Sequence, residues 1–125
     1  AALEPSADDR LSAKTENAVL EFLRAGPELS VDALVRLYAP DLTLPAFSLL
    51  VSRWAHDLMR SALGLEPRYF IDENAAIERL ASHTDAKRAA GFCTQALSCR
   101  RAADHTLNPK QTVESVLLRY KQIFQ

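Results

Sequence analysis

The sequence predicts an all-α fold, a compact bundle of five or six helices joined by short loops. Apolar residues recur at helical spacing along most of the chain, while Ala and Leu are abundant and runs of β-branched residues are scarce. The 125 residues are 48% hydrophobic and 25% charged, which suits one globular domain that folds without a metal or a disulfide. We expect residues 1–9 to form a flexible lead-in and residues 10–125 to form a single helical domain.

Three helices are expected in the first half of the chain. An apolar stripe predicts the first over residues 11–23, and Gly26-Pro27 ends it. Ser30 is expected to cap a short second helix that continues through Tyr38 and ends at Pro40. The third helix ends near Gly64 and has the clearest inward stripe: Phe47, Leu50, Val51, Trp54, Leu58 and Ala62. Its solvated side is expected to carry Ser52, Arg53, Asp57 and Arg60.

Three more helices are expected in the second half. Tyr69-Phe70-Ile71 is predicted to pack as an apolar plug, with exposure of Tyr69 and Phe70 in their loop as the alternative. Asp72 is expected to cap a short helix that buries Ala76, Ile77 and Leu80. Thr84-Asp85 opens the next helix, which is expected to run to about Asp104 and to bury Ala89, Cys93, Ala96 and Leu97. Asn108 as cap and Pro109 as first residue begin the last helix, with this stripe: Val113, Val116, Leu117, Tyr120 and Phe124.

Charge is unevenly distributed along the chain. The net charge is −1, yet residues 1–86 hold eight Lys and Arg against fourteen Asp and Glu, and residues 87–125 hold seven against two. Such a basic excess is typical of a solvated helix face, of a surface that meets an acidic neighbouring subunit, or of one near a phosphate backbone.

The sequence also bears on the compartment. It shows neither a signal-peptide pattern nor an uninterrupted apolar stretch long enough for a membrane span. Cys93 and Cys99 are six residues apart on one expected helix, so they point about 120° apart and cannot bridge. We therefore expect buried thiols in a reducing, cytoplasmic setting.

Groups that could carry chemistry are scattered. The three histidines fall on separate expected elements, and the serines of the third helix lack a Gly-rich turn: His56, His83 and His105, and Ser48, Ser52 and Ser61. The three glycines are isolated and build no phosphate-binding loop. We expect no catalytic residue, no metal, no cofactor and no small-molecule substrate in this chain.

An alternative is a helix-turn-helix-like nucleic-acid-binding domain. The stretch from Ile77 to Gln95 is expected to hold two helices with a tight turn, and the second would present Lys87, Arg88 and Gln95 to phosphates or base edges. The many Ala residues of that second helix favour a core position instead.

Three motifs carry a family resemblance. They are the Trp54–Arg60 run WAHDLMR, the Ile77–Ala81 helix followed by a small-residue helix ending in Arg100-Arg101, and Asn108-Pro109 followed by VESVLLRY. In this order and spacing, over about 70 residues, they resemble the C-terminal collar domain of the delta-prime clamp-loader subunit of bacterial DNA polymerase III. The gamma/tau subunit is the next most similar.

The resemblance implies a subunit-assembly function. Collar domains of five subunits pack into a ring, below which ATPase-like N-terminal domains open a sliding clamp and load it onto primed DNA. Those domains are not among these residues, so this chain would be the detached oligomerisation domain of a larger DNA polymerase III assembly. That assembly is a nucleotidyltransferase, and this domain would contribute to its assembly but not to its catalysis. We expect other clamp-loader subunits as partners, DNA contact only through the whole assembly, and these interface residues: Arg88, Arg100, Arg101, Leu118, Arg119 and Gln122.

Overall fold

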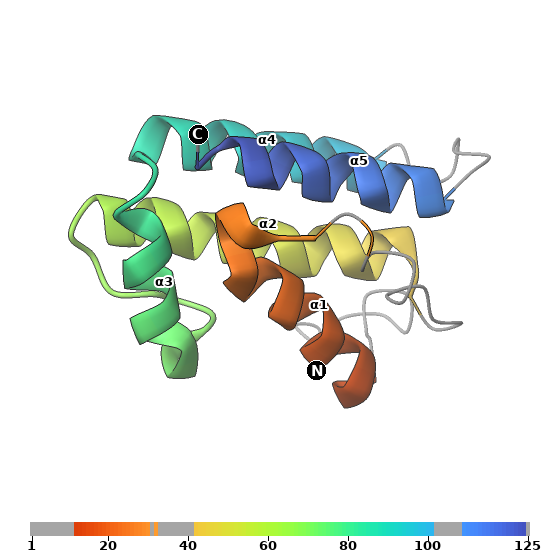
Figure 1. The fold of residues 1–125 in the computed structure, drawn as a ribbon, viewed down its shortest axis with the longest axis horizontal. Helices are drawn as coiled ribbons and strands as arrows, with labels where there is room; N and C mark the ends of the chain where they lie inside the picture. Colours follow the sequence, from red (N-terminus) through yellow and green to blue (C-terminus); the bar gives the residue numbers. More distant parts are fainter. Residues whose placement is uncertain (1–11, 31, 33–41, 102–108, 125) are drawn as a thin grey trace.

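The computed structural model describes residues 12–30, 32, 42–101 and 109–124, without the side chains of Arg100, Arg101 and Pro109. Within these ranges the chain forms five α-helices and two short 3-10 turns, with no strand (Figure 1). The all-α prediction is confirmed. The expected lead-in, most of the helix expected over residues 30–38, and Asn108 lie outside the described residues.

The first two α-helices begin with side-chain caps. Helix α1 spans Ala13–Ala25, and the Ser12 side chain accepts a hydrogen bond from the Thr15 amide at 3.2 Å. Helix α2 spans Leu44–Ala62, where Thr43 accepts from the Ala46 amide at 3.3 Å. Both satisfy amides that the first helical turn leaves unpaired. Gly26, which has a φ of 56°, ends α1 as predicted and opens the 3-10 turn Gly26–Glu28.

Three helices complete the bundle. They are α3 (Asn74–Ala81), α4 (Ala86–Arg101) and α5 (Pro109–Gln122). Asp85 caps α4, because its carboxylate accepts from the Arg88 amide at 2.8 Å. Pro109 is the first residue of α5, as predicted. The prediction that Asp72 caps α3 is wrong, since Ile71–Glu73 form a 3-10 turn that leads directly into the helix.

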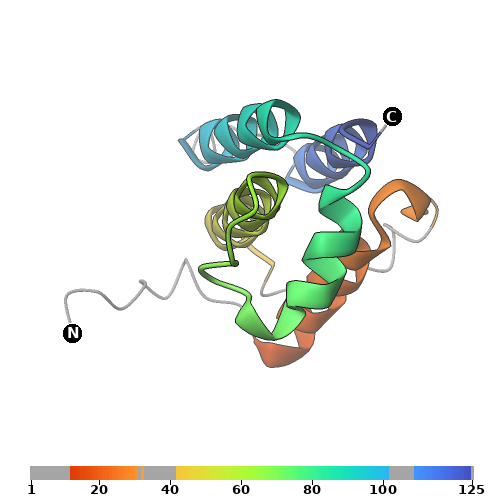
Figure 2. The ribbon, with the colours of Figure 1, turned by 90° about the vertical axis from the view of Figure 1, so that its left-hand side faces the viewer.

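Helix α2 lies at the centre of the molecule. Helices α4 and α5 run side by side along one side of it, and α1 and α3 cover the other (Figures 1 and 2). Because neighbours surround α2, its solvated face is narrower than predicted. Ser52 and Asp57 were expected on that face and are buried instead. The Cys93 thiol of α4 reaches the Ser52 carbonyl at 3.4 Å, which shows how closely α4 lies along this part of α2.

The core forms around Trp54, as predicted, and Trp54 is fully buried together with Phe47, Leu58 and Tyr120. Phe70 packs edge-on against Trp54 with ring centroids 5.3 Å apart, so the plug prediction holds for Phe70. It is wrong for Tyr69 and Ile71, which are 43% and 69% exposed. Only Phe70, between the bend at residues 68–69 and the 3-10 turn that begins at Ile71, faces the core.

The buried face of α4 also differs from the prediction. Ala89, Phe92 and Ala96 are buried and Cys93 is half-buried, whereas Leu97, expected inside, is 41% exposed. One residue on a helix is a rotation of about 100°, so the Ala89–Phe92–Ala96 stripe that meets α2 turns Leu97 toward solvent. In the described part of the chain, none of the helices has both the length and the apolar character needed to cross a membrane.

Candidate interaction surface on α4 and α5

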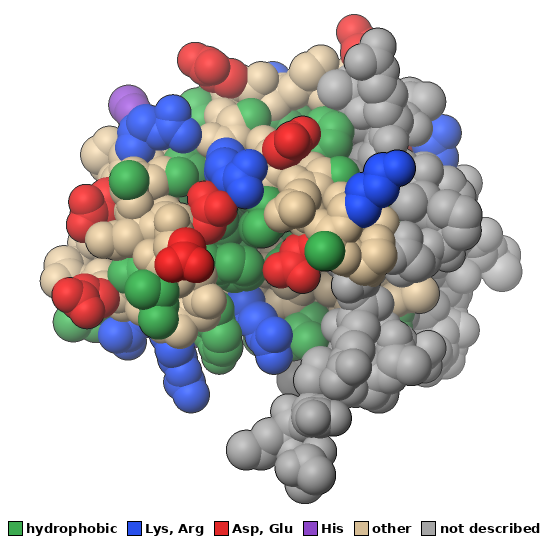
Figure 3. Space-filling view, turned by 90° about the horizontal axis from the view of Figure 1, so that it is seen from below, with side chains coloured by type: hydrophobic (Ala, Val, Ile, Leu, Met, Phe, Trp, Pro, Cys, Tyr) green, Lys and Arg blue, Asp and Glu red, His purple; other side chains and the backbone are tan. Residues whose placement is uncertain are grey.

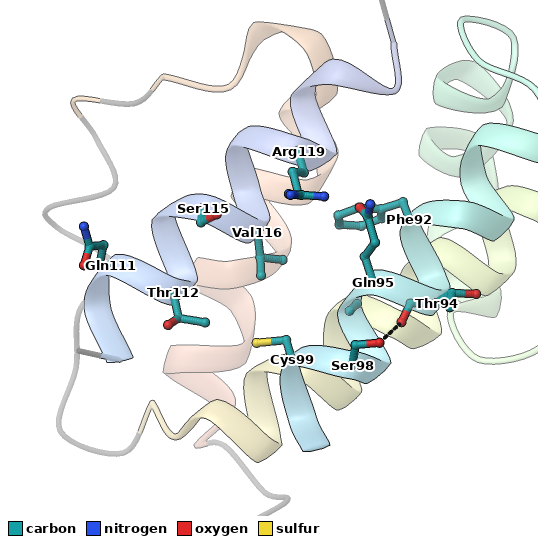
Figure 4. A pocket seen from close by; sticks show the side chains of 11 residues that line it. Phe92, Thr94, Gln95, Ser98, Cys99, Gln111, Thr112, Ser115, Val116 and Arg119 are labelled. Carbon is teal, nitrogen blue, oxygen red and sulfur yellow. Dashed lines mark hydrogen bonds between the residues drawn. The ribbon is translucent and has the colours of Figure 1, made fainter. Parts of the chain in front are cut away.

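A groove of about 610 Å³ lies between α4 and α5 (Figure 4). Its apolar lining comes from both helices: Phe92, Ala96 and Cys99 of α4 and Val116 of α5. Polar side chains complete the lining: Thr94, Gln95, Ser98, Gln111, Thr112, Ser115 and Arg119. We call this hollow the α4–α5 groove. Its apolar floor and polar rim are the composition of a small protein-docking surface.

Small side chains leave this space open. Helix α4 directs its buried stripe at α2 and makes its main packing contacts there, so it touches α5 less extensively. The two helices do meet where the Phe92 and Tyr120 rings pack at a centroid distance of 5.4 Å. Beyond that contact, Cys99 points toward Thr112 across the groove, while the Ser98 hydroxyl donates back to the Thr94 carbonyl at 3.1 Å, and these side chains are too small to fill the space (Figure 4).

Four of the six predicted interface residues line hollows that adjoin or share residues with the groove. Arg88, Arg119 and Gln122 line one hollow with Phe92 and Gln95, and Leu118, Arg119 and Gln122 line another on the outer side of α5. Arg119 lines both of these hollows and the α4–α5 groove. The side chains of Arg100 and Arg101 lie outside the described residues, although both belong to the last turn of α4.

The electrostatics of this surface are mildly basic. Arg88 lies 3.6 Å from the Asp85 carboxylate, which partly offsets its charge. Arg119 is exposed and has no ion-pair partner within the described ranges. Glu114 is the acidic residue that lines the outer hollow. Leu118 adds apolar area beside the groove, since it is 39% exposed and lines the outer hollow of α5.

Sequence reasoning missed the interior of the groove. Phe92, Gln95, Cys99, Ser115 and Val116 line it, and none was predicted to belong to an interface. The many Ala residues of α4 indicated only a core position. Their combination with Ser115 on α5 was the available signal that the two helices leave a gap.

The two cysteines are free, as predicted, but they are half-buried rather than buried. Burial raises the pKa of the Cys93 thiol, which also points at the Ser52 carbonyl. Both features keep Cys93 protonated and unreactive. Cys99, by contrast, lines the α4–α5 groove (Figure 4).

No candidate metal centre emerges from the described side chains. No three His, Cys, Asp or Glu side chains of the described ranges come together as metal ligands would. His56 and His83 belong to separate elements, α2 and the turn before α4, and His105 lies outside the described residues. On the face seen from below, acidic, basic and apolar side chains are interspersed, so that face has no field of a single sign (Figure 3).

Comparison of the chain with protein-family models, with curated proteins and with solved structures finds no match. The clamp-loader resemblance therefore rests on the three sequence motifs alone. Most of their apolar residues lie in the core, where Trp54, Ile77, Leu117 and Tyr120 are buried. The motifs thus describe mainly how the helices of the bundle pack on one another.

Proposed function

We propose that this chain is a protein-interaction domain that assembles with sister subunits through the surface of α4 and α5. The observation that carries the proposal is the α4–α5 groove, which places Phe92 and Val116 beneath a polar rim that includes Arg119. An exposed apolar side chain beside such a groove is typical of docking sites, and Leu118, which lines the adjoining outer hollow of α5, supplies one here.

The resemblance gives this assembly its proposed identity. The chain would be the collar domain of a clamp-loader subunit of the delta-prime type, packed beside its neighbours in the ring that loads a sliding clamp during replication. In this proposal it contributes no catalytic residue, acts in the cytoplasm and meets DNA only through the whole assembly. The basic excess of residues 87–125 favours an acidic surface on the neighbouring subunit.

The direct test is reconstitution with the other clamp-loader subunits of the same organism, followed by size-exclusion chromatography with light scattering. We expect a stable complex that Leu118→Glu and Arg119→Glu each weaken, because one places a charge at an apolar contact and the other reverses a charge at the rim. Lys14→Glu, on the exposed side of α1, is the matched control and should leave assembly intact. A complex that tolerates both α5 variants would refute this surface, and no complex at all would refute the proposed assembly.

Cys99 offers an independent reporter of the same contact. Because it lines the α4–α5 groove, a docked partner should slow its alkylation, while the reactivity of Cys93 should stay low in both states. Equal Cys99 alkylation rates with and without bound partner would argue against occupation of the groove.

The helix-turn-helix alternative has less support from the geometry. Lys87, Arg88 and Gln95 are exposed on α4, as that interpretation requires. However, α3 packs mainly against α2 and α1, and α4 packs mainly against α2, whereas the two helices of such a motif pack on each other. Salt-dependent binding of duplex DNA by this chain alone, lost in Lys87→Gln/Arg88→Gln, would favour the alternative.

A further inference from the structure

The loop between α2 and α3 presents an exposed tyrosine flanked by two arginines. The guanidinium carbon of Arg53 lies 5.2 Å from the centroid of the Tyr69 ring, and that of Arg68 lies 5.5 Å from it. The His56 ring meets the Tyr69 ring edge-on at 5.6 Å. Arg53 and His56 come from α2, and Arg68 and Tyr69 come from the loop, which runs from the end of α2 toward α3 and away from α4 and α5 (Figures 1 and 2).

A buried carboxylate fixes this arrangement. Asp57 is fully buried, and its two oxygens accept hydrogen bonds from three consecutive amides, those of Arg68 at 2.8 Å, Tyr69 at 3.0 Å and Phe70 at 2.8 Å. Phe70 is further held by its contact with Trp54. The backbone on which Arg68 and Tyr69 sit is therefore anchored to the core, so the cluster is organised before any ligand arrives.

The two arginines lack a compensating acid. In the described part of the chain, neither Arg53 nor Arg68 forms an ion pair, and the side-chain N–H groups of both make no hydrogen bond. Asp57, one turn from Arg53 on α2, directs its oxygens at the loop backbone instead. Two like charges are thus held beside one ring, where the negative ring face offsets part of their repulsion and leaves their planar N–H forks available.

We propose that Arg53, Arg68 and Tyr69 form a binding site for a phosphate-type dianion, separate from the α4–α5 groove. Two guanidinium groups match a dianion in charge, and each can donate two parallel hydrogen bonds to an oxyanion. A single carboxylate would neutralise only one of them. The two negative charges have two possible sources: a free phosphate or phosphate monoester, which carries both on one group, and a nucleic-acid backbone, which supplies them on two neighbouring phosphodiesters.

The test is a titration of the ¹⁵N-labelled chain with sodium phosphate at constant ionic strength near neutral pH, followed by NMR. We expect saturable shifts of the Arg68 and Tyr69 amides and of the Nε–H signals of Arg53 and Arg68. The variant Arg53→Gln/Arg68→Gln should bind phosphate at least about tenfold more weakly, since charge-assisted hydrogen bonds are lost. Lys14→Gln/Lys110→Gln removes the same charge from two other exposed positions and should keep the wild-type affinity.

Two further titrations, with an oligonucleotide and with acetate, identify the source of the phosphate and test whether the site prefers phosphate to a carboxylate. Saturation by a single-stranded oligonucleotide at far lower phosphate concentration, with the same residues shifting, assigns the site to a nucleic-acid backbone. Shifts with phosphate but not with the oligonucleotide assign it to a free phosphate or monoester. The proposal is overturned if sodium acetate binds as tightly as phosphate, if no saturable shift maps to these residues, or if the double arginine variant binds like the wild type. An unchanged Trp54 indole signal would show that the variants remain folded.

Discussion

The indole N–H of Trp54 donates a hydrogen bond to the hydroxyl of Tyr120 across 2.9 Å. The Tyr120 hydroxyl in turn donates a short hydrogen bond to the Leu23 carbonyl. Trp54 lies on α2, Tyr120 on α5 and Leu23 on α1, so one phenol oxygen joins three helices inside the core. Polar groups buried at this depth are costly unless they are paired, and this relay pairs all three.

Removing the hydroxyl should therefore destabilise the bundle. In Tyr120→Phe the ring still fills its site, but the Trp54 indole N–H and the Leu23 carbonyl lose their shared partner. We expect the free energy of unfolding to fall by about 1–3 kcal/mol, as measured by urea denaturation followed through Trp54 fluorescence. Tyr69→Phe is the matched control, because its hydroxyl is exposed, and should change stability by less than about 0.5 kcal/mol. Equal effects of the two variants would contradict the relay.

The same residue predicts sensitivity to alkaline pH. Burial raises the pKa of Tyr120 far above its ordinary value of about 10. The folded chain therefore keeps the phenol proton at a pH where the unfolded chain releases it. The stabilising contribution is complete below about pH 10 and is lost as pH rises further, at about 1.4 kcal/mol per pH unit. Urea denaturation at several alkaline pH values should show this slope in the wild type and a shallower one in Tyr120→Phe, and identical slopes would refute it.

The sequence predicted a helix best where a single continuous apolar face packs into the core. The buried stripe of α2 was predicted correctly from Phe47 to Leu58, because its apolar side chains recur without interruption around Trp54, whereas Ala62, expected inside, is exposed. The burial of Asp57 was not predictable in this way. Hydropathy predicts that a carboxylate lies in solvent. Tertiary packing sets the path of residues 68–70, and the three amides of that segment donate the hydrogen bonds that allow Asp57 to be buried.

The candidate surface was predicted only in part. Excess positive charge pointed to α4 and α5, and the structure brings Arg88, Arg119 and Gln122 into one hollow. The groove itself depends on the spacing between two helices that are adjacent in the fold, which no helical periodicity specifies. Leu97 was misassigned for a related reason, since the contact with α2 decides which face of α4 is buried.

Neutralising Asp57 should loosen the loop that carries Arg68 and Tyr69. In Asp57→Asn one carboxylate oxygen becomes an amide that points N–H donors at the backbone amides of residues 68–70. We expect a loss of about 2–3 kcal/mol in the free energy of unfolding, because charge-assisted hydrogen bonds disappear and donors oppose donors. Hydrogen exchange should localise the change, with faster exchange at the amides of Arg68, Tyr69 and Phe70.

Asp72→Asn provides the comparison for this experiment. Asp72 is exposed in the 3-10 turn before α3, so its neutralisation should shift stability by less than about 0.5 kcal/mol and leave exchange at residues 68–70 unchanged. Protection of those amides that survives in Asp57→Asn would show that packing of Phe70 on Trp54 holds the loop without the carboxylate.

Alanine substitutions at the glycines should have opposite signs at two sites. Gly26 ends α1 with a φ of 56°, and an added Cβ would collide with the Cδ2 of Leu80 on α3. Gly26→Ala should lower the free energy of unfolding by about 1–3 kcal/mol, from backbone strain and from displacement of a core leucine. Gly91 lies within α4, where a Cβ meets open space, and Gly91→Ala should raise stability by about 0.5–1 kcal/mol.

Gly64→Ala separates the two contributions at Gly26. Its φ of 82° carries the same backbone penalty, but nothing lies within 4 Å of the added Cβ. We therefore expect Gly64→Ala to cost only the conformational part, about 1 kcal/mol, and Gly26→Ala to cost more by the amount that Leu80 resists displacement. Thermal and urea denaturation of the three variants measure this order. If Gly26→Ala proved as mild as Gly64→Ala, α1 and α3 would not be packed as closely at Leu80 as the structure places them.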